Sequence, residues 1–463
     1  MKKILFITYT YSKGGGSENV LTTLVNHLDS AQYKIDIIEI NQFLVKKEPY
    51  NHNICLLKPM VKANDKKNNL VISYILHKKP EIIKPLFRLY DYDIIITWNY
   101  QLPSFCLHSF KNEVKIAWCH ESMYDLSPET YNSTPEYRNE QLLAWKNADR
   151  IVTVSNKPFR LLKNTFPELE AKIEIINNGI DIKRIQELSL EKINIDIPDI
   201  NNIIVAAGRL DKNKNFELLI YAVSRVIHTG TDCLLIILGE GELLSELEDI
   251  VLKENIKDNV IFTGYKQNPY PFFRLSKILC LSSDLELESW GMVLLEGMSL
   301  GKPFVTTPIA GASEELSDNE RCGLVSDWDI DEYADCIKKL LNNQNIYNEM
   351  SKNCIERANE FSIENMVAKF YSLMDKLNFT HVTDNNLIYK NKNIERIYAI
   401  SYYALVYSLT NQFYRIYNSW YRYKNELTFL NFIKLFFRFG MLLLSVFVFP
   451  VIFLYSFLYG IFK

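Results

Sequence analysis

The chain has 463 residues, 48% of them apolar, and a formal net charge of −3 at pH 7. This length exceeds what one ordinary hydrophobic core holds, so the sequence predicts two domains with residues to spare. The balanced charge gives no general attraction to nucleic acid, and we expect no nucleic-acid partner. Eight scattered cysteines form no CxxC pair, which predicts small core residues in a reducing compartment and no metal site.

Five short, apolar, β-branched runs alternate with helix-length segments in the first half of the chain. They lie at residues 3–8, 34–40, 92–98, 114–120 and 149–155. Such alternation is typical of parallel strands joined by crossover helices. The first run is also too short for the apolar part of a secretion signal. We therefore expect an N-terminal Rossmann-like α/β domain over residues 1–185.

The same alternation restarts after a polar, irregular stretch at residues 186–200, which we interpret as a linker. Further apolar runs follow at residues 202–210, 233–242, 259–265, 277–284 and 302–307. They predict a second Rossmann-like domain over residues 201–378, ending in a closing helix. Two such domains facing each other enclose a cleft, and ligands of open parallel sheets bind beyond the carboxyl ends of the strands.

A glycine-rich turn follows the first predicted strand. Gly15 and Gly16 stand in the run GGGSE, directly before a helical pattern. Glycines at a helix N-terminus let backbone N–H groups approach a phosphate, whose charge the helix dipole favours. The alternative is a simple tight turn. The run lacks the GxGxxG order of a dinucleotide site, which argues against a dinucleotide-dependent oxidoreductase.

Candidate ligand-binding residues also follow the strands of the second domain. Arg209 and Lys214 lie five positions apart in GRLDKNKN, where a guanidinium and an ammonium can converge on a diphosphate. A solvated basic loop is the alternative. Gly239 ends the next strand, and Tyr265 follows the third, where its ring is placed to lie near a flat base.

The stretch from Asp284 to Thr307 places two carboxylates eight positions apart around a glycine. Glu288 falls in the loop after a predicted strand, and Glu296 falls in the second turn of a helix. Both can face one small cavity, because helical side chains lean toward the N-terminus. The expected ligands there are a phosphate for the N–H groups and sugar hydroxyls for the acids, which together describe a nucleotide diphosphate sugar. The helix-start amides belong to Gly291, Met292 and Val293.

The chain resembles the retaining GT-B fold glycosyltransferases of family 4, the group 1 glycosyltransferases. The resemblance covers roughly residues 3–377 through GGGSENVL, AWCHE, VTVSN, IINNGID, AAGRLDKNKNFELLI, LGEGE, FTGY, ELESWGMVLLEGMSLGKP and AGASEEL, in that order. The E-x7-E element formed by Glu288 and Glu296 is the most specific of these motifs.

The resemblance implies roles for individual residues. Glu296 would bind ribose hydroxyls, Glu288 would contact the transferred sugar, and Arg209 with Lys214 would neutralise the leaving diphosphate. His120, the last residue of the run at residues 114–120, matches the family's histidine near the acceptor and the anomeric carbon. The family retains anomeric configuration, generally by front-face attack. Metal is not expected, because cations and helix N-termini already supply positive charge.

Four positions depart from the family's usual pattern. Ser289 and Trp290 stand where a glycine and an aromatic residue are common, and they are expected to reshape the sugar pocket. Asn215 replaces the usual glycine after the lysine. In AGASEEL, Ala310 stands where a glycine is frequent, and Glu314 matches the acid of that motif as a secondary contact.

The last part of the chain, residues 379–463, is basic and aromatic, a composition typical of membrane interfaces. Residues 439–462 contain no Asp, Glu, Lys, Arg or His, and about 20 apolar residues suffice to span a bilayer. Lys434 and Arg438 precede this segment and favour catalytic domains at the cytoplasmic face of the cell membrane. A helix packed on the catalytic core is the alternative. Pro450 permits either a kinked span or a re-entrant hairpin.

The sequence therefore predicts a retaining, metal-independent hexosyltransferase that uses no cofactor. Its donor is a nucleotide diphosphate sugar, with a UDP-sugar as the default. Its acceptor is a lipid-linked or glycan molecule in cell-surface polysaccharide or glycolipid synthesis. The alternatives are a nucleotide-sugar epimerase of the same fold and an inactive, membrane-tethered subunit that binds sugar nucleotides.

Overall fold

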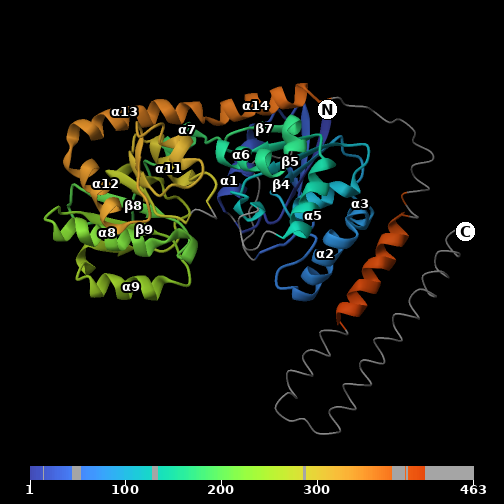
Figure 1. Ribbon diagram of the computed structural model, residues 1–463, viewed down its shortest axis with the longest axis horizontal. Coiled ribbons are helices and arrows are strands. Elements are labelled where there is room, and N and C mark those ends of the chain that lie inside the picture. Colours follow the sequence, from blue (N-terminus) through green and yellow to red (C-terminus); the bar gives the residue numbers. More distant parts are fainter. Residues whose placement is uncertain are drawn as a thin grey trace, which may run out of the picture.

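The computed structural model describes residues 1–13, 15–43, 54–127, 134–284, 288–377, 392 and 395–411. This part of the chain forms two α/β lobes that lie side by side (Figure 1). Each lobe is built on one parallel sheet flanked by helices.

The sheet of the first lobe has the strand order β3-β2-β1-β4-β5-β6-β7, and all its pairs are parallel. Its central strands contain continuous apolar stretches, such as residues 4–7 of β1 and residues 94–96 of β4, because helices cover both faces of the sheet. The strands are β1 (Lys2–Thr8), β2 (Tyr33–Glu39), β3 (Ile54–Leu56), β4 (Ile94–Trp98), β5 (Val114–Cys119), β6 (Arg150–Thr153) and β7 (Ile173–Ile175).

The helices of the first lobe start at recognisable caps. For example, the carboxylate of Asp65 accepts a hydrogen bond from the Asn68 amide at 3.0 Å before α2. The predicted linker begins differently from expectation. Its first three residues are the end of α7, which is capped by Asp181, and only the residues after that helix are irregular. The helices are α1 (Gly16–His27), α2 (Lys66–Lys78), α3 (Ile83–Phe87), α4 (Leu102–Phe105), α5 (Pro135–Lys146), α6 (Asn156–Thr165) and α7 (Ile182–Leu188).

The sheet of the second lobe has the order β10-β9-β8-β11-β12-β13 and is also parallel throughout. Its strands are β8 (Ile203–Ala207), β9 (Leu234–Leu238), β10 (Val260–Phe262), β11 (Ile278–Leu281), β12 (Phe304–Thr306) and β13 (Gly323–Val325). Its helices are α8 (Phe216–His228), α9 (Leu244–Lys253), α10 (Tyr270–Leu275), α11 (Met292–Met298), α12 (Ile330–Asn342), α13 (Gln344–Glu360) and α14 (Ile363–Asp375).

Strand order reverses at one point in each sheet. The reversal lies between β1 and β4 in the first lobe and between β8 and β11 in the second. Loops leaving the two strands at such a point diverge to opposite faces and open a crevice for a ligand. The loops after β8 and β11 are therefore where a ligand of the second lobe is expected.

The closing helix α14 returns to the first lobe, as the sequence predicts, and Figure 1 shows α13 and α14 running along one side of both lobes. Ile180 pairs with Ser362 in an isolated bridge, and the Asp29 amide donates to the Tyr371 hydroxyl oxygen at 2.9 Å. Phe370 packs edge-on against Tyr33 with ring centroids 6.1 Å apart. These contacts fix the second lobe to the first.

Residues 395–411 are helical and pack on the first lobe beside α2 (Figure 1). Ala399 and Val406 are buried, and the Tyr403 hydroxyl donates to Oδ1 of Asn68. No helix within the described residues is long and apolar enough to cross a membrane. The predicted membrane segment at residues 439–462 lies outside the described residues.

All eight cysteines are free thiols. Six are buried as small core residues, whereas Cys55 on β3 is exposed and Cys336 on α12 is partly exposed.

Candidate functional site

An ion pair joins the two loops at the strand-order reversal of the second lobe. Lys214 follows β8 and Glu288 follows β11, and the Lys214 ammonium donates to Oε2 of Glu288. The other oxygen of Glu288 accepts from the Gly291 amide at 3.2 Å. Burial alone would raise the pKa of Glu288, but the Lys214 ammonium and backbone N–H groups hold it below its usual range. The site therefore carries a charged lysine and a charged glutamate in contact.

Local structure fixes the backbone of Lys214. Asp211 starts a short 3-10 turn and accepts from the Lys214 amide at 3.3 Å. The Lys214 carbonyl accepts from the Ser282 hydroxyl at 3.0 Å. Asn215 then adopts a left-handed conformation with φ of 44° and caps α8. Asparagine tolerates this region better than most residues, which explains how it replaces the family's usual glycine.

Glu296 lies in the same lobe, on α11. Its Oε1 accepts from the Tyr270 hydroxyl at 3.4 Å, and it forms no ion pair within the described part of the chain. Burial raises the pKa of Glu296 to about 7, against the smaller lowering effect of the Tyr270 hydrogen bond. The group is therefore an acid that titrates near neutral pH and has acceptor capacity left for ligand hydroxyls.

The starts of α1 and α11 meet across the boundary between the lobes. Gly291 caps α11 with φ of 82°, a conformation that glycine adopts without strain. A Cβ atom on Gly16 would lie 3.7 Å from Cγ of Met292. The structure thus brings the predicted glycine turn of the first lobe next to the E-x7-E element of the second.

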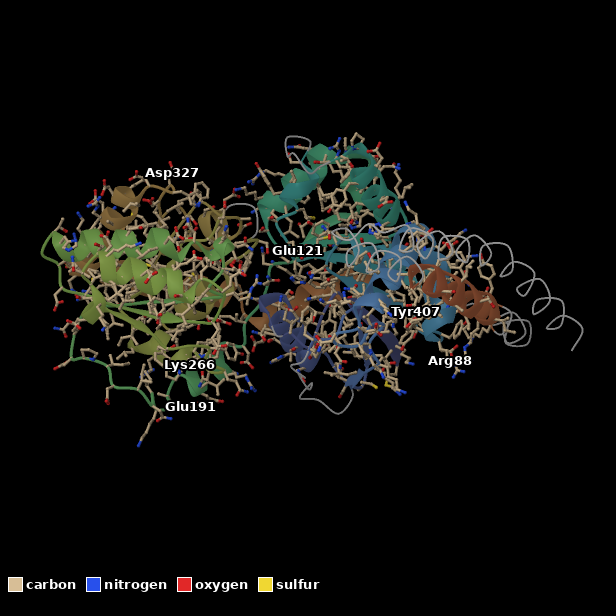
Figure 2. All side chains as sticks on the ribbon, turned by 90° about the horizontal axis from the view of Figure 1, so that it is seen from below. Arg88, Glu121, Glu191, Lys266, Asp327 and Tyr407 are labelled. Atoms are coloured by element: carbon tan, nitrogen blue, oxygen red, sulfur yellow. The ribbon has the colours of Figure 1, made fainter. Side chains whose placement is uncertain are left out.

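His120 lies on the first-lobe side of the same junction. It is 4% exposed, and its ring packs on Trp98 with centroids 4.0 Å apart. Neither ring nitrogen has a hydrogen-bond partner within the described residues, and burial lowers its pKa to about 3. The imidazole is therefore neutral. The backbone carbonyl oxygen of His120 accepts a hydrogen bond from the Ser289 hydroxyl, which places His120 beside the loop of Glu288. Figure 2 shows the next residue, Glu121, where the lobes meet.

Two predicted donor-binding residues do not join this group. Arg209 is in the same loop as Lys214, but its side chain is 63% exposed and pairs with Asp211 at 3.3 Å. Tyr265 is 66% exposed. Gly239 has a packing reason of its own, because a Cβ atom there would lie 1.8 Å from the carbonyl oxygen of Gly208.

The glycine turn before α1 already holds an anion of the chain itself. Oε2 of Glu18 accepts from the Gly15 amide at 2.9 Å and from the Ser17 hydroxyl at 3.2 Å. The carboxylate is 6% exposed and stands where a bound phosphate would meet the helix N-terminus. In this arrangement, Gly15 and Gly16 form a turn that the Glu18 carboxylate caps.

Sequence reasoning missed two contributors. Tyr270 contacts Glu296, although a single tyrosine at a helix start carries no signal. Glu315 crosses between the lobes, where its Oε1 accepts from the Asn156 amide at 2.5 Å. Glu314, a secondary contact by motif, instead pairs with Arg160 of the first lobe at 2.6 Å. The run EE in AGASEEL was the available signal.

Comparisons with known proteins agree with this architecture. The family described as Glycosyltransferase Family 4 matches residues 14–184, and the one described as Glycosyl transferases group 1 matches residues 190–361. The crystal structure of Anabaena HepE in complex with UDP superposes with a TM-score of 0.62 at 18% identity, over 81% of this chain and all of that one. A glycosyltransferase from Rickettsia africae gives 0.63 at 17% identity, over 81% and 98% of the two chains.

One curated relative is a Campylobacter jejuni enzyme. It is named N-acetylgalactosamine-N,N'-diacetylbacillosaminyl-diphospho-undecaprenol 4-alpha-N-acetylgalactosaminyltransferase. It is 28% identical over 324 residues, which cover 69% of this chain and 85% of the relative. The two family matches and the GT-B fold show that the chain belongs to the group 1 glycosyltransferases. It is a glycosyltransferase that uses a nucleotide-sugar donor.

Proposed function

We propose that the protein transfers a hexosyl unit from a UDP-sugar to a lipid-linked glycan acceptor, with retention of anomeric configuration and without a metal. One observation carries the proposal. The Lys214–Glu288 pair occupies the strand-order reversal of the second lobe, with His120 of the first lobe at the adjoining loop. A cation for the diphosphate, a carboxylate for the sugar and an acceptor-side histidine thus meet at one place.

The ion pair suggests how the donor enters. Lys214 is held by Glu288, which a diphosphate can replace as the partner of the ammonium. Glu288 is then released to accept from hydroxyls of the transferred sugar, while Glu296 accepts from the ribose hydroxyls. Arg209 extends from the same loop and supplies the second cation once it leaves Asp211.

Bond cleavage places negative charge on the leaving UDP and positive charge on the anomeric carbon. Lys214, Arg209 and the amides at the start of α11 stabilise that leaving charge, and the amides are held in place by the helix before the reaction. The acceptor hydroxyl attacks from the same face, and its proton passes to the departing phosphate oxygen. His120 is neutral and has two unpartnered nitrogens within the described structure, so it orients hydroxyls without adding charge.

The proposal is tested by ligand-dependent stability and by product stereochemistry. UDP, GDP and ADP, with their common sugar conjugates, are screened by thermal shift on the full chain, since a ligand that binds the native state raises its melting temperature. UDP and one UDP-sugar should stabilise the wild type. The anomeric configuration of the product is then read by NMR. An inverted product contradicts retention, and binding without turnover favours the inactive-subunit alternative.

A membrane-linked acceptor is supported by two observations. The Campylobacter relative is named for a diphospho-undecaprenol acceptor. In this chain, residues 397–411 contain no charged side chain, although Ile397, Ile400 and Tyr407 are exposed. Leu70 and Tyr74 are exposed on the neighbouring helix α2. Figure 2 shows Tyr407 on the part of the first lobe away from the second. An uncharged helical segment with exposed tyrosines suits the bilayer interface.

We place the enzyme at the cytoplasmic face of the cell membrane, anchored by residues 439–462. Full-length protein should float with phospholipid vesicles, and a chain ending at residue 429 should lose most of that binding. The remainder should fall further in L70D, because a charge opposes insertion of the exposed surface. L252D on α9, which alters an equally exposed leucine of the second lobe, is the control. Full flotation of the shortened chain contradicts the anchor.

A further inference from the structure

Ser289, in the Glu288 loop of the second lobe, forms hydrogen bonds to the first lobe, and its neighbour Trp290 is buried beside it. The Ser289 hydroxyl donates to the His120 carbonyl, and the Ser289 carbonyl accepts from the Ser155 hydroxyl at 3.4 Å. Ser289 is 9% exposed and Trp290 is 1% exposed. The sequence predicted that these two residues reshape the sugar pocket, but their described contacts lie at the junction between the lobes.

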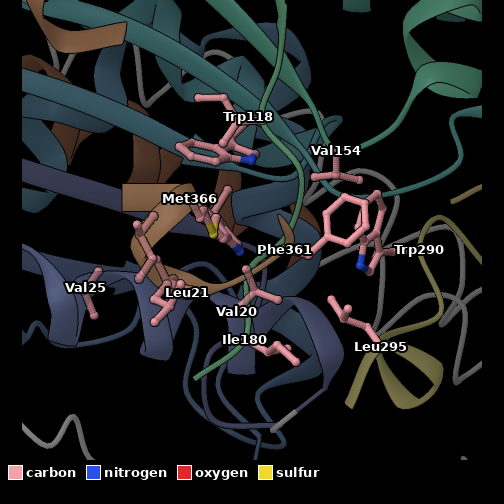
Figure 3. Close-up of a cluster of buried hydrophobic side chains, with 14 of the residues drawn as sticks. Val20, Leu21, Val25, Trp118, Val154, Ile180, Trp290, Leu295, Phe361 and Met366 are labelled. Atoms are coloured by element: carbon pink, nitrogen blue, oxygen red, sulfur yellow. The ribbon is translucent and has the colours of Figure 1, made fainter. Parts of the chain in front are cut away.

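Trp290 anchors the loop in a hydrophobic cluster shared by both lobes. Its indole meets Phe361 edge-on with ring centroids 5.3 Å apart. Figure 3 shows it near Val154 of the first lobe and Leu295 of the second. The backbone approach needs a glycine opposite, since a Cβ atom on Gly311 would lie 2.7 Å from the Trp290 Cα atom. The loop is thus held from both sides.

We propose that Ser289 is a positioning residue that holds the donor-side acid Glu288 in register with the acceptor-side His120. The inference rests on the proposed transferase function and adds a residue to it. Glu288 precedes Ser289 directly, so the hydrogen bond to the His120 carbonyl fixes the distance between the two groups when the lobes are together. Misplacement by about 1 Å costs on the order of a hundredfold in rate.

Other contacts between the lobes do not set the position of Glu288 relative to His120. The Asn156 amide binds Glu315, and Arg160 binds Glu314, at positions outside the Glu288 loop. They hold the lobes together without touching either Glu288 or His120 in the described structure. This separation lets closure of the lobes and alignment of the site be tested independently.

The experiment compares S289A with S289T in the full-length chain. UDP affinity is measured by calorimetry, and turnover is measured as UDP release from the UDP-sugar that the wild type uses, with water as acceptor. We expect S289A to bind UDP within about twofold of wild type, because Lys214 and Glu296 both belong to the second lobe. Its kcat should fall about tenfold or more through lost alignment. S289T keeps the hydroxyl and should recover most of that loss.

Two control variants separate positioning from stability and closure. S276A removes a buried hydroxyl whose hydrogen bond stays within its own helix end, to the Phe273 carbonyl. R160A removes a contact between the lobes that lies outside the loop. Both should keep kcat near the wild-type value.

The outcomes are distinct. Wild-type kcat in S289A, or equal losses of UDP affinity and kcat, would overturn the positioning role while leaving the transferase function intact. A loss in R160A as large as that in S289A would assign the effect to closure of the lobes and would also overturn it. A wild-type chain that neither binds UDP nor releases it from any UDP-sugar would overturn the proposed function, and the inference with it.

Discussion

Helices α1 and α11 begin side by side at the junction of the lobes, each at a glycine with a carboxylate on its amide. At α1, Glu18 receives hydrogen bonds from Gly15 and Ser17, and both donors are neutral neighbours in the chain. At α11, Glu288 receives one from Gly291 and also pairs with Lys214, which comes from a different loop. The carboxylate that binds the glycine amide at the helix start therefore has different further partners in the two helices.

The difference separates a structural cap from a ligand-binding site. A carboxylate satisfied by its own turn has no reason to leave it, and it repels an anion from the helix N-terminus. A carboxylate shared with an ammonium can exchange that partner for a ligand, because a diphosphate satisfies the cation and sugar hydroxyls satisfy the acid. We therefore assign donor binding to α11 and a capping role to Glu18.

The largest expected effect is that of K214A. Loss of the ammonium removes a cation that we propose stabilises the leaving diphosphate, and removal of one such donor typically lowers kcat by about 10²–10³. Steady-state kinetics with the identified UDP-sugar measure the change. K212A, in the same 3-10 turn but with an exposed side chain, is the matched control. Equal kinetics for the two variants would remove Lys214 from the site.

Glu296 gives a pH-dependent effect of intermediate size. Its pKa is about 7, so the carboxyl loses its proton as the pH rises through that value and gains an acceptor for ribose hydroxyls. UDP affinity should therefore rise between about pH 6 and 8 in the wild type and stay lower and flat in E296Q. Calorimetric titrations across this range measure it. A pH dependence unchanged in E296Q would assign the titration to another group.

The same pKa makes a statement about stability. Burial raises the pKa of Glu296 from its usual 4.5 to about 7 in the folded state. Between these two pH values, the folded chain keeps a proton on Glu296 that the unfolded chain has already lost. The free energy of unfolding therefore decreases as the pH rises from 4.5 to about 7, by about 1.4 kcal/mol for each unit of pKa shift at most. E296Q should lack this contribution, which chemical denaturation at pH 5 and about pH 8 would reveal.

The long strands and their loops could be predicted from the sequence, as could the edge strand β10, but the other three edge strands could not. Central strands contain continuous apolar runs, residues 4–7 in β1 and Leu234–Leu238 in β9, because both faces of a parallel sheet are covered. The strands β3, β7 and β13 have only three residues each and lie at sheet edges, where no hydrophobic period can develop. Tertiary pairing alone defines them.

The site residues also divide into some that the sequence could predict and some that it could not. The E-x7-E spacing and the strand-end position of Lys214 were visible because each depends on a single loop or helix. Ser289 and Glu315 act through partners more than a hundred positions away, His120 and Asn156, and no local pattern encodes such a contact. The exposure of Arg209 and Tyr265 was hidden for the same reason, since it depends on how each loop folds back on its lobe.

The smallest expected effect is that of E18Q, and it tests the comparison most directly. The variant keeps an acceptor for the Gly15 amide but removes the negative charge at the start of α1. Loss of a helix cap costs about 1 kcal/mol, so the free energy of unfolding should fall by that amount or less.

UDP affinity of E18Q should stay at the wild-type value if α11 alone receives the diphosphate. E217Q, in the first turn of α8, alters a first-turn acid away from the junction and controls for the general effect of charge at a helix start. Tighter UDP binding in E18Q than in E217Q would mean that Glu18 competes with the ligand for the start of α1. The glycine turn would then be a second part of the donor site, and the distinction between the two helix starts would be one of occupancy rather than of role.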